Sequence, residues 1–450
     1  MGKNKTIPTV PLIRFLKHSL EILKNPLPFH HKNFERLGDT FRLKIGFNKS
    51  VVFSRDAAFL QYVLQKNQRN YTKSPIQTQD LAKYIGRGLL TAEGKHWKRQ
   101  RKLIQPAFHK KQLTTILEVM QETISEELQH IKTERPFDIF SVYNNLAFQV
   151  VAKSLFSGGV SRTQIDRLQH ITETAQKMLV RELRQPYLHW WFRLSGTLQR
   201  HLDLTQEARQ ILTNLVRERQ ASGKREDDLL DMLLDARYED GNAMDEEQLI
   251  DEILILFVAG HETTSNALTF TTQLLAKHPE YQNQISAEVS QAKATSEDYM
   301  KILQQLPITT AVIEESLRLY PPAYFIDRVN LEADTFEGMH FEKGTSLLFA
   351  VHEIHKSENY WNNPTSFTPE RFIGKQHSEF ASHYFPFGAG PRMCIGNNFA
   401  MYEMVLSIAT LCDTFEIDQS DDPIDINPLI TLKPKNAILK FHSKKVHSHV

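Results

Sequence analysis

Two short segments of this 450-residue chain combine residue types that could do chemistry. The first surrounds Cys394, one of only two cysteines, in the segment Phe385-Pro-Phe-Gly-Ala-Gly-Pro-Arg-Met-Cys-Ile-Gly396. Gly388 and Gly390 predict a tight, irregular turn, and residues 397–406 after it predict a helix. Just ahead of a helix N-terminus, where peptide dipoles favour an anion, a thiolate can act as a nucleophile, a redox sulfur or a metal ligand.

The second segment is the polar insert Ala259-Gly-His-Glu-Thr-Thr-Ser265, which directly follows an apolar run over residues 250–258. That run is too apolar for a surface helix and predicts a central, buried one. A polar insert that contains glycine costs stability there and therefore needs a functional reason. The pair His261-Glu262 begins the zinc-protease pattern His-Glu-x-x-His, but Ser265 stands where the second histidine must be, which excludes that class.

The cysteine segment carries a longer pattern, Phe-x-x-Gly-x-Arg-x-Cys-x-Gly, formed by Phe387, Gly390, Arg392, Cys394 and Gly396. This pattern resembles the haem-binding signature of the cytochrome P450 family. The insert at residues 259–265 matches the oxygen-binding motif of the same family. A dinucleotide-binding Gly-x-Gly-x-x-Gly turn is excluded, because Met393 occupies the third glycine position.

The resemblance implies haem b as the cofactor, with Cys394 as its axial thiolate ligand. It implies Glu262 and Thr263 as the catalytic acid and alcohol that hold water and deliver protons. A threonine in the middle of a helix is expected to bond back to the preceding turn and loosen it locally. Glycine and alanine before the pair would let the helix backbone pass close to the haem. The remaining haem contacts, two propionate sites included, are expected from Trp97, Arg101, Ala259, Arg328, Phe387, Gly388, Arg392 and Gly396.

Charged residues of three segments are assigned structural or surface roles. Glu315-Ser-Leu-Arg318 puts an acid and a base on one helical face, a pair worth little by itself. The resemblance implies that Glu315, Arg318 and Arg371 form a buried structural network behind the haem loop. His355 stands where the family has His-Arg-Asp, but Lys356-Ser357 replaces Arg-Asp, so its role is left open. Basic residues at 98, 99 and 102 are expected on an exposed helix face, where the family docks acidic electron-transfer proteins.

Five aromatic residues lie close together between positions 187 and 192. Such a cluster is usually core or a rim contact, whereas the resemblance places this region between two helices that cover the substrate pocket. The cluster suits lipid and isoprenoid chains as well as stacking on a sugar ring, so it does not choose the substrate. The candidate pocket residues are Tyr187, Trp190, Trp191, Ala323, Tyr324, Phe325 and Ile430.

Charge and cysteine usage exclude several classes of partner and site. The 54 basic and 53 acidic side chains give a net charge of +1, which argues against nucleic acid as the main partner. Two cysteines without C-x-x-C spacing indicate neither a disulfide framework nor a structural zinc site, so a reducing, cytoplasmic location is expected. The first thirty residues hold no long apolar run. A leucine stripe at 12, 16, 20 and 23 predicts a packed helix, with membrane-surface contact as the alternative.

The pattern along the chain predicts a mainly α protein with a small β-rich part. Alternating apolar residues at 41–45 and 51–53 predict a hairpin, helical periodicity dominates residues 55–320, and strand-like runs return at 346–351, 430–432 and 437–441. A single domain over residues 1–450 is expected. Its parts are a β-rich part at about 35–60, a helical bulk at about 75–325, and the cysteine loop with C-terminal strands at about 326–450. The resemblance implies the cytochrome P450 fold, a triangular helical prism with a buried haem.

The resemblance implies a haem-thiolate monooxygenase that uses O2 and two electrons to hydroxylate, or oxidatively O-dealkylate, a small organic substrate. A fatty acid, a terpenoid and a methyl ether such as a methylated sugar all remain open. No residues are left for a fused reductase, so a ferredoxin or flavodoxin with its reductase is expected as separate chains, and the protein as a monomer without a transmembrane segment. A peroxide-driven haem hydroxylase is one alternative, disfavoured by the Glu262-Thr263 pair. A non-catalytic haem sensor or binding protein, which would need only Cys394, is the other.

Overall fold

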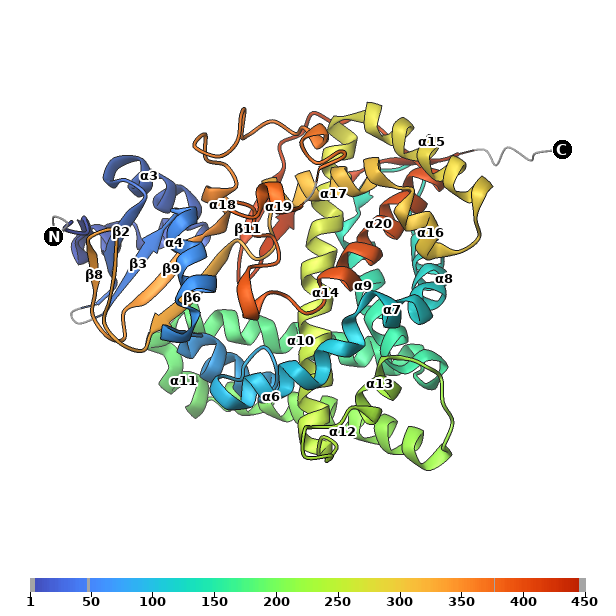
Figure 1. The fold of residues 1–450 in the computed structure, drawn as a ribbon, viewed down its shortest axis with the longest axis horizontal. Helices are drawn as coiled ribbons and strands as arrows, with labels where there is room; N and C mark the ends of the chain where they lie inside the picture. Colours follow the sequence, from blue (N-terminus) through green and yellow to red (C-terminus); the bar gives the residue numbers. More distant parts are fainter. Residues whose placement is uncertain (1–4, 47–48, 376, 445–450) are drawn as a thin grey trace. The chain divides into compact units, whose positions relative to one another are not determined.

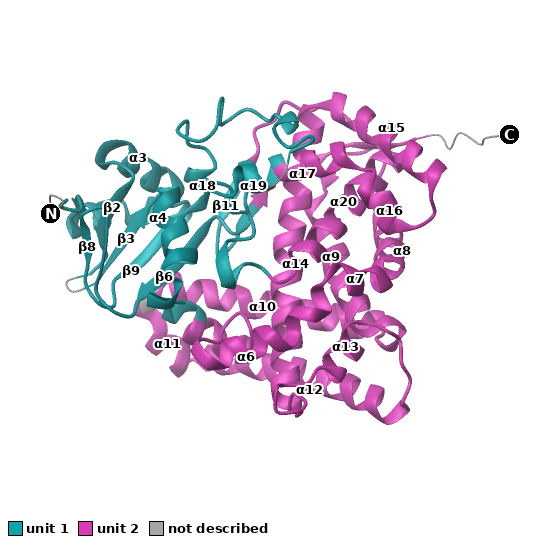
Figure 2. Ribbon diagram, viewed as in Figure 1, with its two compact units in different colours: residues 1–77, 315–394, 426–433 teal, residues 78–314, 395–425, 434–450 magenta. Residues whose placement is uncertain are grey.

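The computed structural model describes residues 5–46, 49–375 and 377–444. The described chain is mainly helical with small sheets, as predicted (Figure 1). It divides into two compact units, coloured separately in Figure 2. Unit 1 comprises residues 1–77, 315–394 and 426–433, and unit 2 comprises residues 78–314, 395–425 and 434–450. The expectation of a single domain stays a prediction.

Unit 1 is built on a mixed sheet with the strand order β1-β2-β3-β9-β6-β4. Its strands are β1 (Thr9–Val10), β2 (Thr40–Lys44), β3 (Ser50–Ser54), β4 (Tyr71–Thr72), β6 (Phe325–Asn330) and β9 (Ser346–Ala350). β2 and β3 pair antiparallel with Phe41 opposite Phe53, which confirms the predicted hairpin, although residues 47 and 48 of its connection lie outside the described residues. Phe41, Leu43 and Phe53 are buried together in one core cluster, as strand alternation requires.

Short elements surround this sheet in unit 1. They are α3 (Leu27–Leu37), α4 (Ala57–Gln61), a π-helical turn η1 (Tyr62–Lys66), β7 (Asp334–Phe336), β8 (Met339–Phe341), α18 (Val351–Ile354) and α19 (His377–Phe380). β7 and β8 form a separate antiparallel hairpin. α17 (Pro307–Leu319) crosses from unit 2 into unit 1 at residue 315.

The leucine stripe near the N-terminus does not form the packed helix that the sequence predicted. α1 (Leu12–Lys17) and α2 (Ser19–Lys24) are separate helices, and neither contains a buried residue. Leu16 and Leu20 are 57% and 75% exposed, whereas Phe15 and Ile22 pack against the core. The break at position 18 shifts the helical phase, so the leucines no longer share one buried face. Across the described residues no helix is both long and apolar enough to cross a membrane.

Unit 2 holds the long helices. They are α5 (Ala82–Ile85), α6 (Gly94–Ile104), α7 (Lys110–Leu113), α8 (Leu117–Leu128), α9 (Phe140–Phe156), α10 (Arg162–Arg184), α11 (His189–Leu194), α12 (Thr197–Ser222), α13 (Leu229–Asp235), α14 (Glu246–Lys277), α15 (Pro279–Thr295), α16 (Tyr299–Gln304) and α20 (Asn397–Thr414). From its second turn to its last turn, α14 is almost entirely buried, as its apolar composition predicted. It contacts α9, α12 and α20 (Figure 1).

Small antiparallel pairs complete unit 2. β5 (Phe137–Asp138) pairs with β13 (Ile438–Leu439), and β10 (Phe415–Ile417) pairs with β14 (Phe441–Ser443). The strands β11 (Asp425–Pro428) and β12 (Leu432–Lys435) lie at the boundaries of the 426–433 segment of unit 1. The strand-like patterns near the C-terminus therefore do form strands, each shorter than or offset from its expected range.

Candidate functional site

The two cysteines of the chain differ in exposure. Cys394 is exposed in the loop that precedes α20, whereas Cys412 is buried within α20. Burial raises the pKa of the Cys412 thiol to about 12, which makes its thiolate inaccessible at neutral pH. Cys394 is therefore the sulfur that can reach a ligand.

The Cys394 loop is held by its own backbone and by a close approach to η1. The Cys394 N–H donates to the carbonyl of Phe387 at 2.9 Å. Gly388 and Gly390 have φ values of +72° and +69°, which favour glycine. A Cβ on Gly390 would lie 2.1 Å from the carbonyl oxygen of Leu64, so a side chain at this position would displace the loop. The exposed thiol thus sits on a backbone with little freedom to move.

The predicted structural network comes together in unit 1. Arg318 donates from Nε and Nη2 to the two carboxylate oxygens of Glu315, both at 2.7 Å, and both side chains are 0% exposed. Arg371 Nε lies 3.4 Å from the same carboxylate, which also accepts the Thr368 N–H at 2.9 Å. A fully buried ion pair is tolerated only where such additional hydrogen bonds compensate the lost hydration.

His355, whose role the sequence left open, links this network to the Cys394 loop. Its carbonyl accepts a 2.7 Å hydrogen bond from Arg318 Nη1, and its ring Nε2 accepts the Phe385 N–H at 2.8 Å. Burial, assisted by the charge of Arg318, lowers the pKa of His355 to about 3. The ring is therefore neutral and can accept this bond. The only signal in the sequence was the position of His355, six residues before Trp361.

Two further arginines of unit 1 were expected near the cofactor. Arg328 is 8% exposed on β6 and donates from Nη1 to the carbonyl of Asp327 at 2.7 Å. Arg392 Nη1 lies 3.4 Å from the carbonyl and from Oε1 of Gln68. These contacts position both guanidinium groups, and their role as carboxylate ligands stays a prediction.

In unit 2, one stripe of α14 is accessible in a helix that is otherwise buried. Between residues 249 and 276, all side chains are buried except those at 256, 258, 259, 260 and 263. Positions 256, 259, 260 and 263 follow the i, i+3, i+4, i+7 spacing of a single helix face. The stripe contains Ala259, Gly260 and Thr263 of the predicted oxygen-binding motif, and buried Glu262 lies beside it.

Thr263 makes the expected back-bond within α14. Its hydroxyl donates to the carbonyl of Ala259 at 2.7 Å, which confirms the prediction and leaves the oxygen lone pairs able to accept. Gly260 also lies close to α9. A Cβ there would lie 2.8 Å from Cγ2 of Val151 on α9. Within unit 2 this approach favours glycine, and a close approach of the backbone to the haem stays a prediction.

The basic helix α6 carries two further predicted haem contacts of unit 2. Trp97 is buried, and Arg101, one turn later, is partly exposed with its Nε donating to Gln105 Oε1 at 3.0 Å. The other basic residues of α6 lie in solvent, as expected. Arg99 and Lys102 pair there with acidic residues at 240 and 239, which reduces the positive charge of this surface.

The predicted pocket residues occupy several environments. Tyr187, Trp190 and Trp191 are 65%, 60% and 52% exposed, as expected for rim positions. Tyr324 is buried, and its hydroxyl donates to the carbonyl of Leu429 at 2.6 Å. The remaining three are exposed Ala323 and Ile430, and Phe325, which packs against the core of unit 1. Their place in a substrate pocket stays a prediction.

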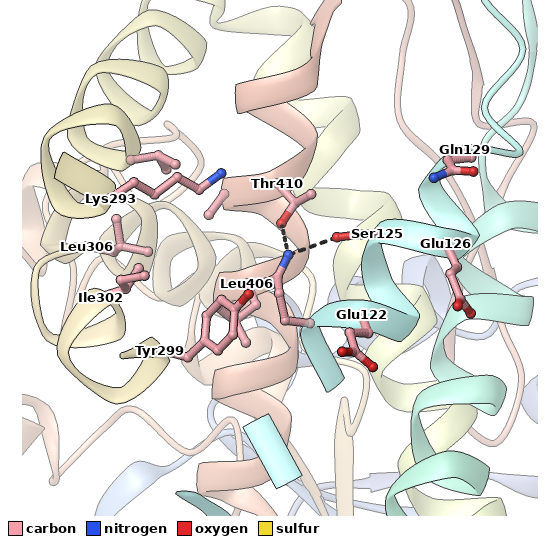
Figure 3. A pocket seen from close by; sticks show the side chains of 13 residues that line it. Glu122, Ser125, Glu126, Gln129, Lys293, Tyr299, Ile302, Leu306, Leu406 and Thr410 are labelled. Carbon is pink, nitrogen blue, oxygen red and sulfur yellow. Dashed lines mark hydrogen bonds between the residues drawn. The ribbon is translucent and has the colours of Figure 1, made fainter. Parts of the chain in front are cut away.

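Two hollows of unit 2 differ in character. A surface groove of about 420 Å³ is lined by polar and apolar side chains of α8, α15, α16 and α20, and no predicted site residue lies in it (Figure 3). A mostly apolar crevice of about 20 Å³ includes Leu254 and Val258 of α14 among its walls. At that volume the crevice cannot hold a substrate without movement of its walls.

Comparisons with known proteins cover almost the whole chain. The family model described as Cytochrome P450 matches residues 8–441. The cyclooctat-9-en-7-ol 5-monooxygenase of Streptomyces melanosporofaciens is 29% identical over 91% of this chain and 88% of the relative. The cytokinin hydroxylase of Arabidopsis thaliana is 32% identical over 85% and 77%, and the pentalenene oxygenase of Streptomyces avermitilis is 26% identical over 92% and 91%. The crystal structure of the cytochrome P450DA heme domain matches with a TM-score of 0.86 at 20% identity, covering 100% of both chains.

Proposed function

The chain belongs to the cytochrome P450 family and is a monooxygenase of that family, and from this premise we propose which residues do the chemistry and on what class of substrate. We propose that Cys394 is the axial thiolate of haem b. We also propose that the enzyme uses O2 and two electrons to hydroxylate a carbon of an apolar small molecule, with terpenoids as the favoured class.

The residues present suit a haem. An exposed thiol stands on a glycine-constrained loop in unit 1. The haem edge and propionates would be contacted by the side chains of Trp97, Arg101, Arg328 and Arg392. Unit 2 offers the accessible α14 stripe in a buried helix. When bound, a thiolate-ligated haem supplies oxygen activation and the insertion of one oxygen atom into a C–H bond.

The observation that carries the assignment is the accessible α14 stripe with its acid–alcohol pair. The Thr263 hydroxyl uses its proton on Ala259 O, so its lone pairs can accept from a water molecule and hold it. Glu262 directly precedes Thr263 in the same turn and would exchange protons with that water. A positioned acid–base pair of this kind contributes about 10²–10⁴-fold to a rate.

Electrons would come from a ferredoxin or flavodoxin with its reductase, acting on a monomer of this chain. The proposed substrate class rests on two relatives and on the unit 2 crevice. Two relatives are named as a cyclooctat-9-en-7-ol 5-monooxygenase and a pentalenene oxygenase, and the crevice beside α14 is lined mainly by apolar side chains. Both favour an apolar substrate. A fatty acid and a methyl ether, including a methylated sugar, are the competing classes.

The test compares Thr263→Ala with Thr271→Ala, a matched control because Thr271 makes the same back-bond, to Ala267 O at 2.8 Å, in a fully buried part of α14. Both variants and the parent should show the red-shifted carbon monoxide band of a thiolate-ligated haem after reduction. Only Thr263→Ala should release peroxide, with product per electron pair falling about tenfold or more. Equal coupling in all three proteins would refute the role of Thr263, and absence of the red-shifted band from the parent would refute Cys394 as ligand.

A binding screen tests the substrate class. Cyclic terpenoids, long-chain fatty acids and methylated sugars are titrated against the purified protein, and displacement of the haem-bound water is followed by the shift of the main absorption band. Cyclic terpenoids should give the largest shift at the lowest concentration. A shift confined to methylated sugars would overturn the apolar assignment.

A further inference from the structure

The histidine beside the acid–alcohol pair is buried, yet the proposed chemistry does not use it. His261 is 1% exposed in α14, and its Nε2 lies 2.8 Å from Oδ1 of Asn144 on α9. Its ring also meets Phe148 of α9 edge-on, with centroids 5.1 Å apart and an interplanar angle of 76°. Burying an imidazole between two helices costs more free energy than burying an aliphatic side chain. The presence of a histidine at this position therefore needs a functional reason.

Glu173 on α10 fixes which way the Asn144 amide faces. Asn144 Nδ2 donates to Glu173 Oε1 at 2.7 Å, and Gln169 Nε2 donates to the same oxygen at 3.2 Å. Burial opposes ionisation of Glu173, but these two donors, together with nearby positive charge, hold the pKa of the carboxyl below its usual value. A carboxylate only accepts hydrogen bonds, so the amide nitrogen of Asn144 must face Glu173 and its oxygen must face His261. His261 Nε2 must therefore carry a hydrogen.

This line of hydrogen bonds sets the rotation of α14 about its axis. Successive residues of a helix are 100° apart, so His261 and Thr263 lie about 200° apart, on nearly opposite faces. A bond that holds His261 toward α9 therefore holds Thr263 on the accessible stripe. Gly260 permits this arrangement because α9 comes close at Val151. The back-bond of Thr263 loosens the same turn, which makes an external anchor useful.

We propose that His261 is a positioning residue for the monooxygenase reaction, held by Glu173 through Asn144, and that it fixes the rotation of the turn that presents Glu262 and Thr263. The inference rests on the proposed function of that pair. The proposal requires one N–H donor at Nε2 of residue 261. It does not require proton transfer through the ring. Any side chain that places a neutral N–H donor at this point should therefore serve.

Four variants isolate that donor. His261→Leu removes it, and Asn144→Leu removes its acceptor together with the bond to Glu173. His261→Gln keeps a donor, because the glutamine Nε2 stands the same number of bonds from Cβ as the histidine Nε2. Asn145→Leu is the matched control, since Asn145 is exposed on the next position of α9 and accepts from Gln169 at 3.0 Å. Thr263→Ala serves as the reference for loss of the pair.

Two measurements on the haem-loaded, substrate-free proteins test the proposal. Amide hydrogen exchange of residues 259–265 should become about fivefold faster in His261→Leu and Asn144→Leu and stay unchanged in His261→Gln and Asn145→Leu. The second measurement is the rate at which dissolved oxygen re-oxidises the dithionite-reduced protein. In His261→Leu and Asn144→Leu this rate should change in the same direction as in Thr263→Ala, and by at least half of the change that Thr263→Ala causes. It should match the parent in the other two variants.

Each contrary result overturns a definite claim. Faster exchange with an unchanged re-oxidation rate would make His261 a packing residue and refute positioning. A glutamine variant as defective as the leucine variant would show that the ring itself is required, and would also refute it. A Thr263→Ala protein that re-oxidises like the parent would instead refute the role of Thr263 in the proposed function.

Discussion

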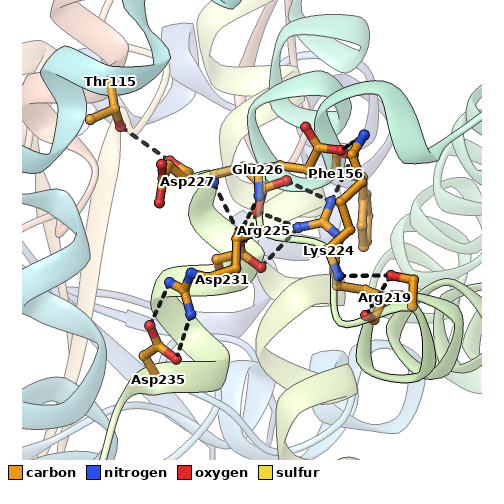
Figure 4. A network of polar contacts seen from close by, with 11 residues as sticks. Thr115, Phe156, Arg219, Lys224, Arg225, Glu226, Asp227, Asp231 and Asp235 are labelled. Atoms are coloured by element: carbon orange, nitrogen blue, oxygen red, sulfur yellow. Dashed lines mark hydrogen bonds and ion pairs between the residues drawn. The ribbon is translucent and has the colours of Figure 1, made fainter.

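Arg318 in unit 1 and Arg219 in unit 2 both bind carboxylates away from solvent, but they hold different kinds of segment. Arg318 pairs with Glu315 of its own helix and donates to backbone carbonyls of residues 355, 364 and 366. Arg219, near the end of α12, donates to Asp228 and Asp231 at 2.8–3.0 Å and to the carbonyl of Phe156 at 3.1 Å (Figure 4). The first network holds the chain that leads to the cysteine loop, and the second holds the loop between α12 and α13.

The two networks also differ in the hydrogen-bond donors that their carboxylates would keep if the arginine were removed. Glu315 is 0% exposed and, apart from Arg318, has one backbone donor, the Thr368 N–H, and a longer contact from Arg371. Asp231 also accepts the N–H groups of residues 226 and 227, and Asp228 caps α13 by accepting the Asp231 N–H. Backbone donors remain when a side chain is changed. We therefore expect the unit 1 network to be the more fragile and the more closely tied to haem retention.

Arg318→Met should have the largest effect. It leaves the Glu315 carboxylate buried without its main partner, which costs about 3–5 kcal/mol of unfolding free energy. It also releases the carbonyl of His355, so the protein should retain less haem. Denaturant unfolding and the ratio of haem to protein absorbance measure the two effects. Arg217→Met, in an exposed pair with Glu246, is the control and should leave both values unchanged. Parent-like stability of Arg318→Met would contradict the comparison.

Arg219→Met should cost less, about 1–3 kcal/mol, because the aspartates keep their backbone donors. Haem content should equal that of the parent, since this network ties together only segments of unit 2 that the proposed function does not use. The same unfolding and absorbance measurements apply. Haem loss comparable to that of Arg318→Met would show that the difference between the networks has been misjudged.

Acidification should distinguish the two networks by the pH range over which each one loses stability. The folded pKa of His355 is about 3, below the usual 6.5, so the unfolded chain binds a proton that the folded ring refuses. Its contribution to stability is complete above pH 6.5 and is lost as the pH falls toward 3, by about 1.4 kcal/mol per pH unit. Burial opposes ionisation of Asp231, but bonds from Glu226, Arg219 and Asp227 hold its pKa below the usual value, so its contribution is lost only below about pH 3.8.

The measurement is the pH dependence of unfolding free energy between pH 7 and 5. His355→Gln should reduce the slope relative to the parent, because one group with a depressed pKa is gone. Asp231→Asn should lower stability but leave the slope unchanged over this range. Identical slopes for the parent and His355→Gln would mean that His355 takes up its proton at the same pH in the folded and unfolded chains.

Local sequence predicted the parts of the site that depend on neighbouring residues. The turn at Gly388 and Gly390, the helix after it and the back-bond of Thr263 all formed as expected, since each needs only nearby backbone. The leucine stripe at the N-terminus failed, because a one-residue break changes which face is buried. His355 could not be assigned from its surroundings, because its acceptor role depends on Phe385, thirty residues away.

Sequence by itself determined the family and predicted the thiol at 394 and the acid–alcohol pair, because fixed spacing within one turn or one helix specifies such motifs. Tertiary structure alone decided why glycine is favoured at position 260 and why His261 faces Asn144. It also decided that two arginine networks of similar composition differ in their reserve of hydrogen-bond donors. Burial and long-range hydrogen bonds depend on segments far apart in the chain, and no local pattern records them.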